Sequence, residues 1–144
     1  MKKNIPVLAK RSDCAISMAL DTVGDKWSLI ILRDLMFTGK RSYGELQSCE
    51  EKIATNILAS RLTHLEENKI IRKQLDPADS RRSLYYLTEK GIQLVPVIIE
   101  LMHWMSKHNP EASECASSAK SYEQDRVGLY EEIMERLRAE HLAI

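Results

Sequence analysis

Residues 42–88 read SYGELQSCEEKIATNILASRLTHLEENKIIRKQLDPADSRRSLYYLT, and no other stretch constrains the architecture of the chain as strongly. A short helix is expected to end near Ser48, and after a polar turn a second helix covers about residues 54–68. Strand-forming residues at 70–75 and 83–87 flank a turn-forming segment. The predicted order is therefore helix, turn, helix and β-hairpin.

Two local signals support this order. Ser42 stands three residues before Glu45, which is the spacing of a capping box, where two residues satisfy free N–H groups at a helix start reciprocally. In the second helix, Leu58, Leu62 and Leu65 follow the i, i+4, i+7 spacing of a buried face. The stretch predicts a mainly α-helical protein with a small β-hairpin, in the arrangement of a winged helix-turn-helix.

Two helices are expected before this stretch. Asp13 can cap a helix that ends near Gly24. Asp25 can cap the next helix, which is strongly apolar and closes near Thr38. We interpret the second of these as the core helix.

After the hairpin, Thr88 is expected to cap a long helix that runs to about His108, with Pro96 either bending it or lying in its early turns. Apolar residues between 92 and 105 point nearly all round this helix, and a second subunit would bury the surplus. The predicted parts are a basic N-terminal arm (1–12), a winged helix-turn-helix domain with a long dimerisation helix (13–108), a linker (109–121) and a C-terminal helix (122–144).

The composition is that of an ordinary globular domain, with 44% hydrophobic and 29% charged residues among 144. The formal net charge is zero, but residues 1–12 hold four bases and no acid, whereas residues 109–144 hold four bases and eight acids. A neutral protein can still bind phosphate groups if its bases share one face. No apolar run suits a signal peptide or a membrane span, so a cytoplasmic location is expected.

Nothing in the sequence predicts an active site or a metal centre. The cysteines at 14, 49 and 115 are far apart and form no Cys-x-x-Cys pair, which argues against structural zinc and a disulfide framework. The four histidines show no ligand spacing, and no nucleophile arrangement or Gly-rich phosphate loop is present. We therefore expect no enzyme activity, no metal and no cofactor.

The outer arc of the helix at residues 54–66 is small, polar and weakly charged. Small side chains allow close approach to the major groove, and an asparagine can form two hydrogen bonds with an adenine edge. A solvated surface is the alternative, although ordinary exposed helices carry more Lys and Glu there. The candidate base-reading residues are Thr55, Asn56, Ala59, Ser60 and Thr63.

Two groups of residues are candidates for contact with the DNA backbone. Arg81 and Arg82 stand at or just after the hairpin tip, where arginines can lie over a phosphate or enter a narrow minor groove. In the alternative they belong to a solvated turn, and Asp79 can hold Arg81 when DNA is absent. The second group comprises Lys40, Arg41 and the helix start capped by Ser42.

Arg61 does not fit the polar arc, because it falls on the apolar side near Leu58 and Leu65. Either its stem packs while its guanidinium reaches a phosphate, or the side chain is buried against Asp34 or Glu45. We favour the structural role.

Cys14 is expected at the start of the first helix, near Lys10 and Arg11. Helix N-termini and cations lower the pKa of a thiol and so favour the reactive thiolate, which makes Cys14 a candidate redox sensor. In the alternative, Cys14 is a small residue packed at a dimer interface.

These residues and their neighbours resemble the HxlR-type transcriptional regulators, relatives of MarR within the winged-helix class. The resemblance covers roughly residues 10–108. The matching segments are residues 14–16 (CAI), 24–32 (GDKWSLIIL), 41–46 (RSYGEL), 53–62 (IATNILASRL) and 86–91 (YLTEKG).

The resemblance implies a homodimeric DNA-binding regulator with a recognition helix that begins near Thr55 and a wing at residues 70–87. Some members of the family use a cysteine at the position of Cys14 to sense oxidants or electrophiles. The family often has proline after this cysteine, whereas Ala15 stands here.

The sequence thus predicts a transcriptional regulator that binds specific double-stranded DNA as a homodimer, with Cys14 as a candidate sensor of redox or electrophile signals. It leaves open a small-molecule effector of unknown identity. The alternative is a winged-helix module that binds another protein and does not bind DNA.

Overall fold

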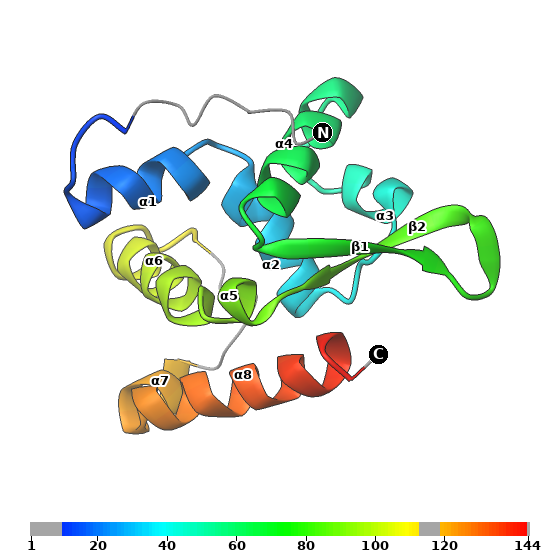
Figure 1. Ribbon diagram of the computed structural model, residues 1–144. Helices are drawn as coiled ribbons and strands as arrows, with labels where there is room; N and C mark the ends of the chain where they lie inside the picture. Colours follow the sequence, from blue (N-terminus) through cyan, green and yellow to red (C-terminus); the bar gives the residue numbers. More distant parts are fainter. Residues whose placement is uncertain (1–9, 113–118, 144) are drawn as a thin grey trace.

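The computed structural model describes residues 10–112 and 119–143, and Figure 1 shows how their helices surround one β-hairpin. This mainly α-helical arrangement, with a hairpin after the second of two consecutive helices, confirms the predicted winged helix-turn-helix. The elements in chain order are α1 (Ala15–Val23), α2 (Ser28–Phe37), α3 (Tyr43–Gln47), α4 (Thr55–Glu67), β1 (Ile71–Asp76), β2 (Asp79–Leu87), α5 (Glu89–Ile92), α6 (Val95–His108), α7 (Ala119–Gln124) and α8 (Arg126–His141).

The helix-turn-helix pair consists of α3 and α4. At the start of α3 the Ser42 hydroxyl accepts a hydrogen bond from the Glu45 N–H (3.2 Å) and donates one to the Glu45 carboxylate (2.8 Å). The cap therefore forms, but Glu45 binds the hydroxyl and not the backbone N–H that a complete capping box would use. The second helix begins and ends within a residue of its predicted bounds.

The hairpin is longer and its turn tighter than predicted. The strands pair antiparallel from Ile71 opposite Leu87, and Asp76 pairs with Asp79, so that only Pro77 and Ala78 form the turn. The second strand therefore begins at residue 79, four residues before its expected start. The Asp76 carboxylate accepts the Ala78 N–H (2.9 Å), which closes the turn through a side chain and lets the strands pair up to it.

The core lies between α2, α4 and the inner ends of the hairpin strands. In α2, Ile31, Leu32, Leu35 and Met36 are buried, which confirms this helix as the core helix. The predicted stripe on α4 is buried as well. Burial of a leucine side chain contributes about 1.5–3 kcal/mol, so these faces fix how α4 sits on the domain.

The predicted long helix after Thr88 is two helices. The first, α5, ends at Ile92, and α6 starts three residues later at Val95, with Pro96 in its first turn. Proline lacks the N–H that a helix interior requires but suits a helix start, so Pro96 begins α6 and does not bend a continuous helix. Thr88 caps α5 by accepting the Gly91 N–H (3.2 Å), as predicted for this residue.

The terminal helices also differ in detail from the sequence predictions. Cys14, not Asp13, is the N-cap of α1, and the Asp13 carboxylate pairs with Lys10 instead. The predicted C-terminal helix is divided at Asp125, whose carboxylate caps α8 by accepting the Gly128 N–H (3.0 Å). The helix α7 starts inside the expected linker, while residues 1–9 of the arm and 113–118 of the linker lie outside the described residues.

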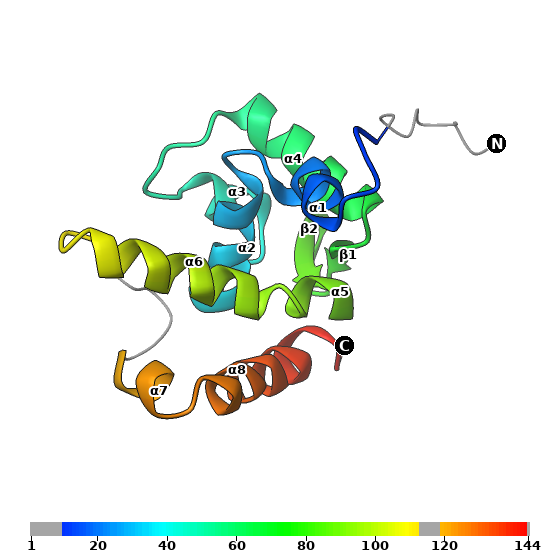
Figure 2. The ribbon, with the colours of Figure 1, turned by 90° about the vertical axis from the view of Figure 1, so that its left-hand side faces the viewer.

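The hairpin and α5 separate α4 from α8. In both Figure 1 and Figure 2, α4 lies above the hairpin and α8 below it. The buried stripe of α8 consists of Leu129, Ile133, Leu137 and His141, and it packs on the chain's own core, whereas Val127 at the start of the helix is 62% exposed. In the described part of the chain no helix is both long and apolar enough to cross a membrane.

Candidate nucleic-acid interface

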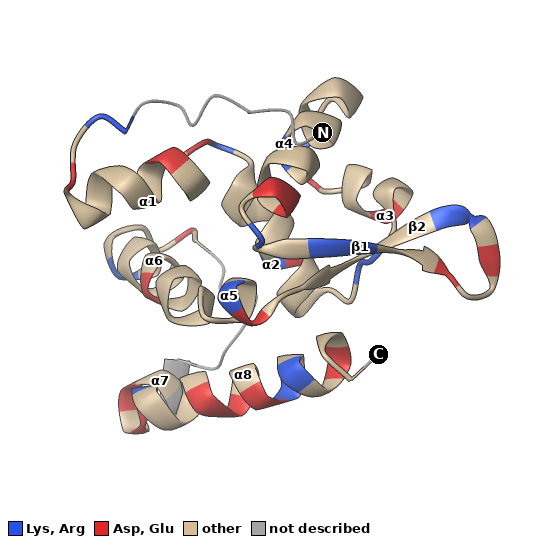
Figure 3. Cartoon of the chain, viewed as in Figure 1, with Lys and Arg blue, Asp and Glu red and all other residues tan. Residues whose placement is uncertain are grey.

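The outer face of α4 carries all five candidate base-reading residues. They are exposed, and a hollow of about 420 Å³ runs along the helix from Ala59 to Glu67. Most of α4 is tan in Figure 3, the colour of residues other than Lys, Arg, Asp and Glu, and the acidic residues of this helix lie in its last turn. The base-reading candidates are thus brought together on one surface, namely Thr55, Asn56, Ala59, Ser60 and Thr63.

The start of α4 is held by α3. The Tyr43 hydroxyl donates a hydrogen bond to the backbone carbonyl of Thr55 over 2.6 Å. The N-cap residue is Ala54, which has no side-chain acceptor, so the first N–H groups of α4 are not capped by it. The positive end of the helix dipole therefore stays available to an anion at this point.

Arg61 takes the structural role, but with a partner that the sequence analysis did not name. Its guanidinium lies 3.5 Å from the carboxylate of Asp25, and not against Asp34 or Glu45. Burial raises the pKa of Asp25, but hydrogen bonds from Ser28 and Trp27 and the charge of Arg61 outweigh this and lower it overall. Asp25 thus connects α4 to the N-terminal turn of α2, which it caps.

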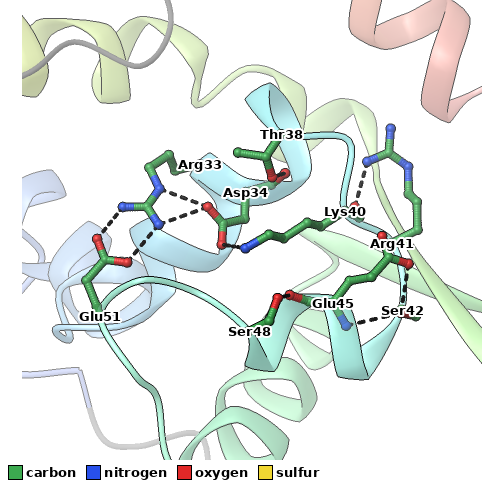
Figure 4. Close-up of polar contacts among 9 residues, drawn as sticks. All are labelled: Arg33, Asp34, Thr38, Lys40, Arg41, Ser42, Glu45, Ser48 and Glu51. Carbon is green, nitrogen blue, oxygen red and sulfur yellow. Dashed lines mark hydrogen bonds and ion pairs between the residues drawn. The ribbon is translucent and has the colours of Figure 1, made fainter.

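Lys40 is engaged inside the protein. Figure 4 shows its ammonium against Asp34 of α2, with 3.0 Å between Nζ and the carboxylate oxygen. The side chain of Asp34 is only 2% exposed, and Arg33 also donates to it over 2.9 Å. A buried carboxylate needs such partners, so Lys40 is a structural partner of Asp34 before it is a phosphate contact.

Arg33 extends this cluster to the turn between α3 and α4. Its two terminal nitrogens lie 2.6 and 2.9 Å from the two oxygens of Glu51, a bidentate pair that is visible in Figure 4. The hydrogen bonds from Arg33 lower the pKa of Glu51 to about 2, and those same bonds raise the pKa of Arg33. The turn that precedes α4 is thereby fixed to the core helix.

Arg41 and Ser42 also point inward. Arg41 donates to the carbonyls of Leu35 (2.9 Å) and of Lys40 (2.7 Å), and its guanidinium lies 3.5 Å from Glu140 of α8. Burial lowers the pKa of Arg41, against the effect of Glu140. Ser42 is buried in its cap. The structure therefore brings Lys40, Arg41 and Ser42 together, but uses their polar groups internally.

The wing arginines are the most accessible of the phosphate candidates. The Arg81 side chain is 90% exposed and lies 3.1 Å from Asp79, as anticipated. Arg82 is 52% exposed and lies 3.0 Å from Asp76. The hydrogen bond from Arg81 lowers the pKa of Asp79. Figure 3 shows these charges at the far end of the hairpin. The pair of Arg81 with Asp79 is exposed on both sides and can exchange partners at little cost, whereas the Asp76 side chain that holds Arg82 is only 9% exposed.

Cys14 is exposed at the start of α1. The backbone N–H groups of Ser17 and Ile16 lower the pKa of its thiol. The cations expected to assist are occupied elsewhere, since Lys10 pairs with Asp13 and Arg11 with Asp21. The helix start, and not neighbouring cations, therefore favours the thiolate.

Exposed apolar side chains lie on α1 and α6, on the same side of the molecule (left in Figure 1). Ile16 is 71% exposed and Trp104 is 58% exposed, which is unusual for residues of their size. A surface of this kind indicates a protein contact. Its members are Ile16, Leu20, Val97, Leu101, Trp104 and Met105, and we call it the α1–α6 face.

Sequence reasoning missed two sets of residues. The Asp34 cluster could not be found, because its members carry no motif and the burial of Asp34 follows only from the packing of α2. His141 could have been found, since it follows Leu137 and Ile133 at four-residue spacing and completes the buried stripe of α8. Among residues 10–112 and 119–143, no group of three or more His, Cys, Asp or Glu side chains is placed to hold a metal ion.

The chain is similar to known transcriptional regulators. It is 34% identical over 105 residues to the HTH-type transcriptional regulator sll1512 of Synechocystis, which covers 73% of this chain and 76% of that protein. It is 34% identical over 86 residues to YodB of Bacillus subtilis, covering 60% and 76% of the two chains. The solved structure described as PA1607, a putative transcription factor, matches with a TM-score of 0.65 and 33% identity over 73% of each chain.

Two further solved structures are regulators studied in defined redox states. The reduced form of YodB from B. subtilis matches with a TM-score of 0.57 and 30% identity, over 72% of this chain and all of that one. The redox regulator HypR in its oxidised form matches with a TM-score of 0.56 and 26% identity, over 67% and 97%. The family model for the HxlR-like helix-turn-helix matches residues 22–113. The chain therefore belongs to the HxlR-like helix-turn-helix family, whose members are transcriptional regulators and not enzymes.

Proposed function

We propose that this protein is a cytoplasmic transcriptional regulator that recognises specific sequences in double-stranded DNA as a homodimer. The observation that carries the proposal is the outer face of α4, which is exposed, polar and nearly uncharged, beside a hairpin that ends in exposed arginines. A helix of this composition fits the major groove, while cations on the wing fit the adjacent phosphates.

In this proposal α4 reads bases. Asn56, in the first turn, is suited to a bidentate contact with adenine, and a contact of this kind discriminates by about 1–3 kcal/mol. The small side chains of Ala59 and Ser60 let the helix approach the base edges. The uncapped start of α4 adds a contact to a phosphate. Thr55 and Thr63 complete the reading face.

The wing supplies the main phosphate contacts. Arg81 can exchange Asp79 for a DNA phosphate or enter the minor groove, because both side chains of this pair are accessible. Arg82 is 52% exposed and can approach a phosphate while it stays paired with Asp76. Lys40, Arg41 and Ser42 form a weaker set, since each would have to give up an internal contact first.

Two copies would cover the α1–α6 face. The homodimer would place two copies of α4 about one turn of DNA apart, roughly 34 Å, so that each reads one half of a two-fold symmetric site. The apolar side chains on α1 and α6 support this part of the proposal, because they are more exposed than a monomer requires.

Cys14 is the proposed sensor. HypR is described as a redox regulator, and YodB has been solved in reduced, diamide-treated and quinone-bound forms. In this chain the support is local: the thiol is exposed, and its pKa is lowered by the start of α1. Oxidation or alkylation of Cys14 would then weaken DNA binding.

The test is DNA binding by fluorescence anisotropy, with fragments of the region upstream of the gene and a salt titration. Wild-type affinity should fall steeply with salt, because binding releases counterions from phosphates. Arg81→Ala should weaken binding to all fragments and reduce the salt slope, whereas Asn56→Ala should change the base preference. Arg126→Ala removes an arginine of α8 that pairs with Glu100 of α6 and belongs to neither α4 nor the wing, so it should leave binding unchanged.

The alternative is a winged-helix module that binds a protein. No shift on any fragment at low salt, with the folded protein confirmed by circular dichroism, would favour it over DNA binding. Equal affinity for all DNA sequences would also remove the base-reading role of α4.

A further inference from the structure

We propose that α8 positions the wing for DNA, with His141 as the positioning residue. This inference rests on the proposed function only in that the wing contacts DNA. The helix lies beyond residues 22–113, which the family model matches.

The side chain of His141 holds the second strand. It is completely buried, and its Nδ1 accepts the backbone N–H of Leu87 over 3.0 Å. Leu87 is the last residue of β2 and lies opposite Ile71, and this N–H is on the strand edge away from β1. On the same edge the Tyr85 N–H binds the carbonyl of Arg41 (2.8 Å). His141 therefore completes the outer edge of the wing at its base.

The backbone of the same residue holds the first strand. Arg72 of β1 donates to the carbonyl of His141 over 2.6 Å and to Gln74 over 2.6 Å. Its guanidinium lies over the ring of Tyr86 at 4.7 Å, and that ring meets the His141 imidazole edge-on. One residue of α8 thus contacts both strands of the wing, each through a different group.

The rest of α8 is fixed to parts of the domain outside the wing. Arg138 pairs with Glu89 of α5 (2.8 Å), and Arg136 donates to the carbonyl of Met36 in α2 (3.2 Å). Nearer the start of α8, the Tyr130 hydroxyl donates a hydrogen bond to Glu100 of α6. The helix is therefore a brace between the helical core and the wing base, on the side of the hairpin away from α4 (Figures 1 and 2).

Contacts at the base of the wing should set the position of the arginines at its tip. A two-stranded hairpin is marginally stable without support. The arginines at the tip lie about six residues from Leu87, which corresponds to roughly 20 Å of strand. A tilt of about 10° at the base would displace them by roughly 3 Å, which is enough to break a hydrogen bond. The direction of Arg81 and Arg82 thus depends on contacts at the other end of the strands.

The test compares His141→Ala with His141→Asn, whose carboxamide oxygen can replace Nδ1 as an acceptor for the Leu87 N–H. In free protein, hydrogen–deuterium exchange of the hairpin amides (71–87) should rise about tenfold in His141→Ala and return towards wild type in His141→Asn, while amides of α4 stay unchanged. Unchanged exchange of the hairpin in His141→Ala would overturn the proposal without reference to DNA.

A double-mutant cycle tests the consequence for binding. Arg81→Ala should cost about tenfold in affinity for DNA in the wild type and in His141→Asn, but less than twofold in His141→Ala. Asn56→Ala should cost the same factor in all three backgrounds, because α8 does not support α4. If Arg81→Ala reduces DNA affinity by the same factor in all three backgrounds, His141 does not position the wing. No cost of Arg81→Ala even in the wild type would instead refute the wing contact in the proposed function.

Arg72→Met provides a second variant if His141→Ala does not fold. It keeps an unbranched apolar stem over Tyr86 and removes the guanidinium, with its hydrogen bonds to the His141 carbonyl and to Gln74. Because the bond to His141 is the one that joins β1 to α8, the substitution should raise hairpin exchange and reduce the cost of Arg81→Ala in the same way. If Arg72→Met changes neither the exchange of the hairpin amides nor the cost of Arg81→Ala for DNA affinity, α8 does not position the wing.

Discussion

The imidazole Nε2 of His64 lies 2.8 Å from the backbone carbonyl of Thr22. A carbonyl only accepts, so the ring donates, and the hydrogen bond joins the face of α4 to the end of α1, the helix that begins at Cys14. The ion pair between Arg61 and Asp25 makes a second link one turn away on α4. A shift of α1 therefore has a direct physical route to the base-reading helix.

We expect His64→Ala to blunt the response of DNA binding to an electrophile such as a quinone. In the wild type, alkylation of Cys14 should weaken DNA affinity; in His64→Ala the same treatment should weaken it less, because one link between α1 and α4 is missing. Loss of this hydrogen bond should also reduce the free energy of unfolding by about 1 kcal/mol. Affinity before and after alkylation, measured by anisotropy, tests the first effect.

Cys14→Ser is the control for this response. The serine variant should bind DNA like the wild type and should keep its affinity under the electrophile. If wild type and Cys14→Ser lose affinity equally, Cys14 is not the sensor, and the contact between His64 and Thr22 is structural only.

Removal of the buried carboxylate of Asp34 should be strongly destabilising. Asp34→Ala leaves Lys40 and Arg33 without the acceptor that balances them in a poorly solvated site. Breaking one side of a buried ion pair costs about 3 kcal/mol or more. Urea denaturation should show a lower midpoint with an unchanged slope.

Glu51→Ala is the matched comparison for Asp34→Ala. It removes the other carboxylate of Arg33, but the Glu51 side chain is 34% exposed, so less than about 1 kcal/mol should be lost. Equal effects of the two substitutions would show that burial does not set the strength of this cluster.

Acid should destabilise the fold through His141. Burial, followed by the charges of Arg41, Arg72 and Arg136, lowers the pKa of this side chain from 6.5 to about 4. Because the folded state disfavours the proton, the contribution of His141 is fully present above pH 6.5 and is lost as the pH falls towards 4. The loss is about 3 kcal/mol. Urea unfolding of wild type and His141→Asn from pH 7.5 to 4.5 measures it.

The asparagine variant has no group that titrates at this position. Its stability should therefore fall less than that of the wild type over the same pH range, so the difference between the two proteins should narrow at low pH. A constant difference between them would mean that protonation of His141 does not drive the acid sensitivity.

Local signals in the sequence were enough to find the helix-turn-helix. The cap at Ser42 and the leucine stripe of α4 depend on residues three to seven positions apart, and the structure confirms both. The roles of Lys40 and Arg41 could not be found in this way. Their partners include Asp34, buried in α2, and Glu140, which is about a hundred residues away in sequence. An exposed cation and an internally paired one look alike in sequence.

Helix breaks were also hard to predict. Apolar residues lie on both sides of residue 93, but the chain turns there, where Gly91 packs against Ile70 and α6 starts anew at Val95 with Pro96 in its first turn. In α8 the sequence contains two neighbouring apolar stripes. Which of the two is buried depends on the surface against which the helix packs, and in the structure it is the stripe that ends at His141.

Trp104→Glu should convert the protein to a monomer if the α1–α6 face is the dimer interface. The side chain is 58% exposed in a single chain, so the substitution should not disturb the fold, but it places a charge within an apolar contact. Light scattering should give the mass of one chain, and DNA affinity should fall by about a hundredfold, because two linked half-site contacts are lost.

Val127→Glu is the control for this prediction. Val127 is 62% exposed on α8 and is not one of the residues of the α1–α6 face, so its substitution should leave the mass unchanged. If light scattering still gives the mass of a dimer for Trp104→Glu, the dimer interface lies elsewhere on the protein.

Gly91→Ala should prevent or strongly weaken folding. A Cβ at this position would lie 2.2 Å from the carbonyl oxygen of Ile70, closer than any real contact. That oxygen already accepts the backbone N–H of Thr88 (3.0 Å) and the Thr88 hydroxyl (3.0 Å), so it cannot move without loosening the junction of α5 with the hairpin. We expect a loss of at least about 2–3 kcal/mol, measured by thermal or urea unfolding.

Gly44→Ala is the comparison that isolates this clash. Gly44 lies in α3, and no atom lies within 4 Å of the position that its Cβ would occupy. Alanine is favoured over glycine in a helix by about 1 kcal/mol, so this substitution should be neutral or stabilising. The two substitutions make the same chemical change in a helix and should have opposite signs, because only Gly91 must lie against a backbone carbonyl. A small effect of Gly91→Ala would mean that the join of wing and helix is more loosely packed than the structure has it.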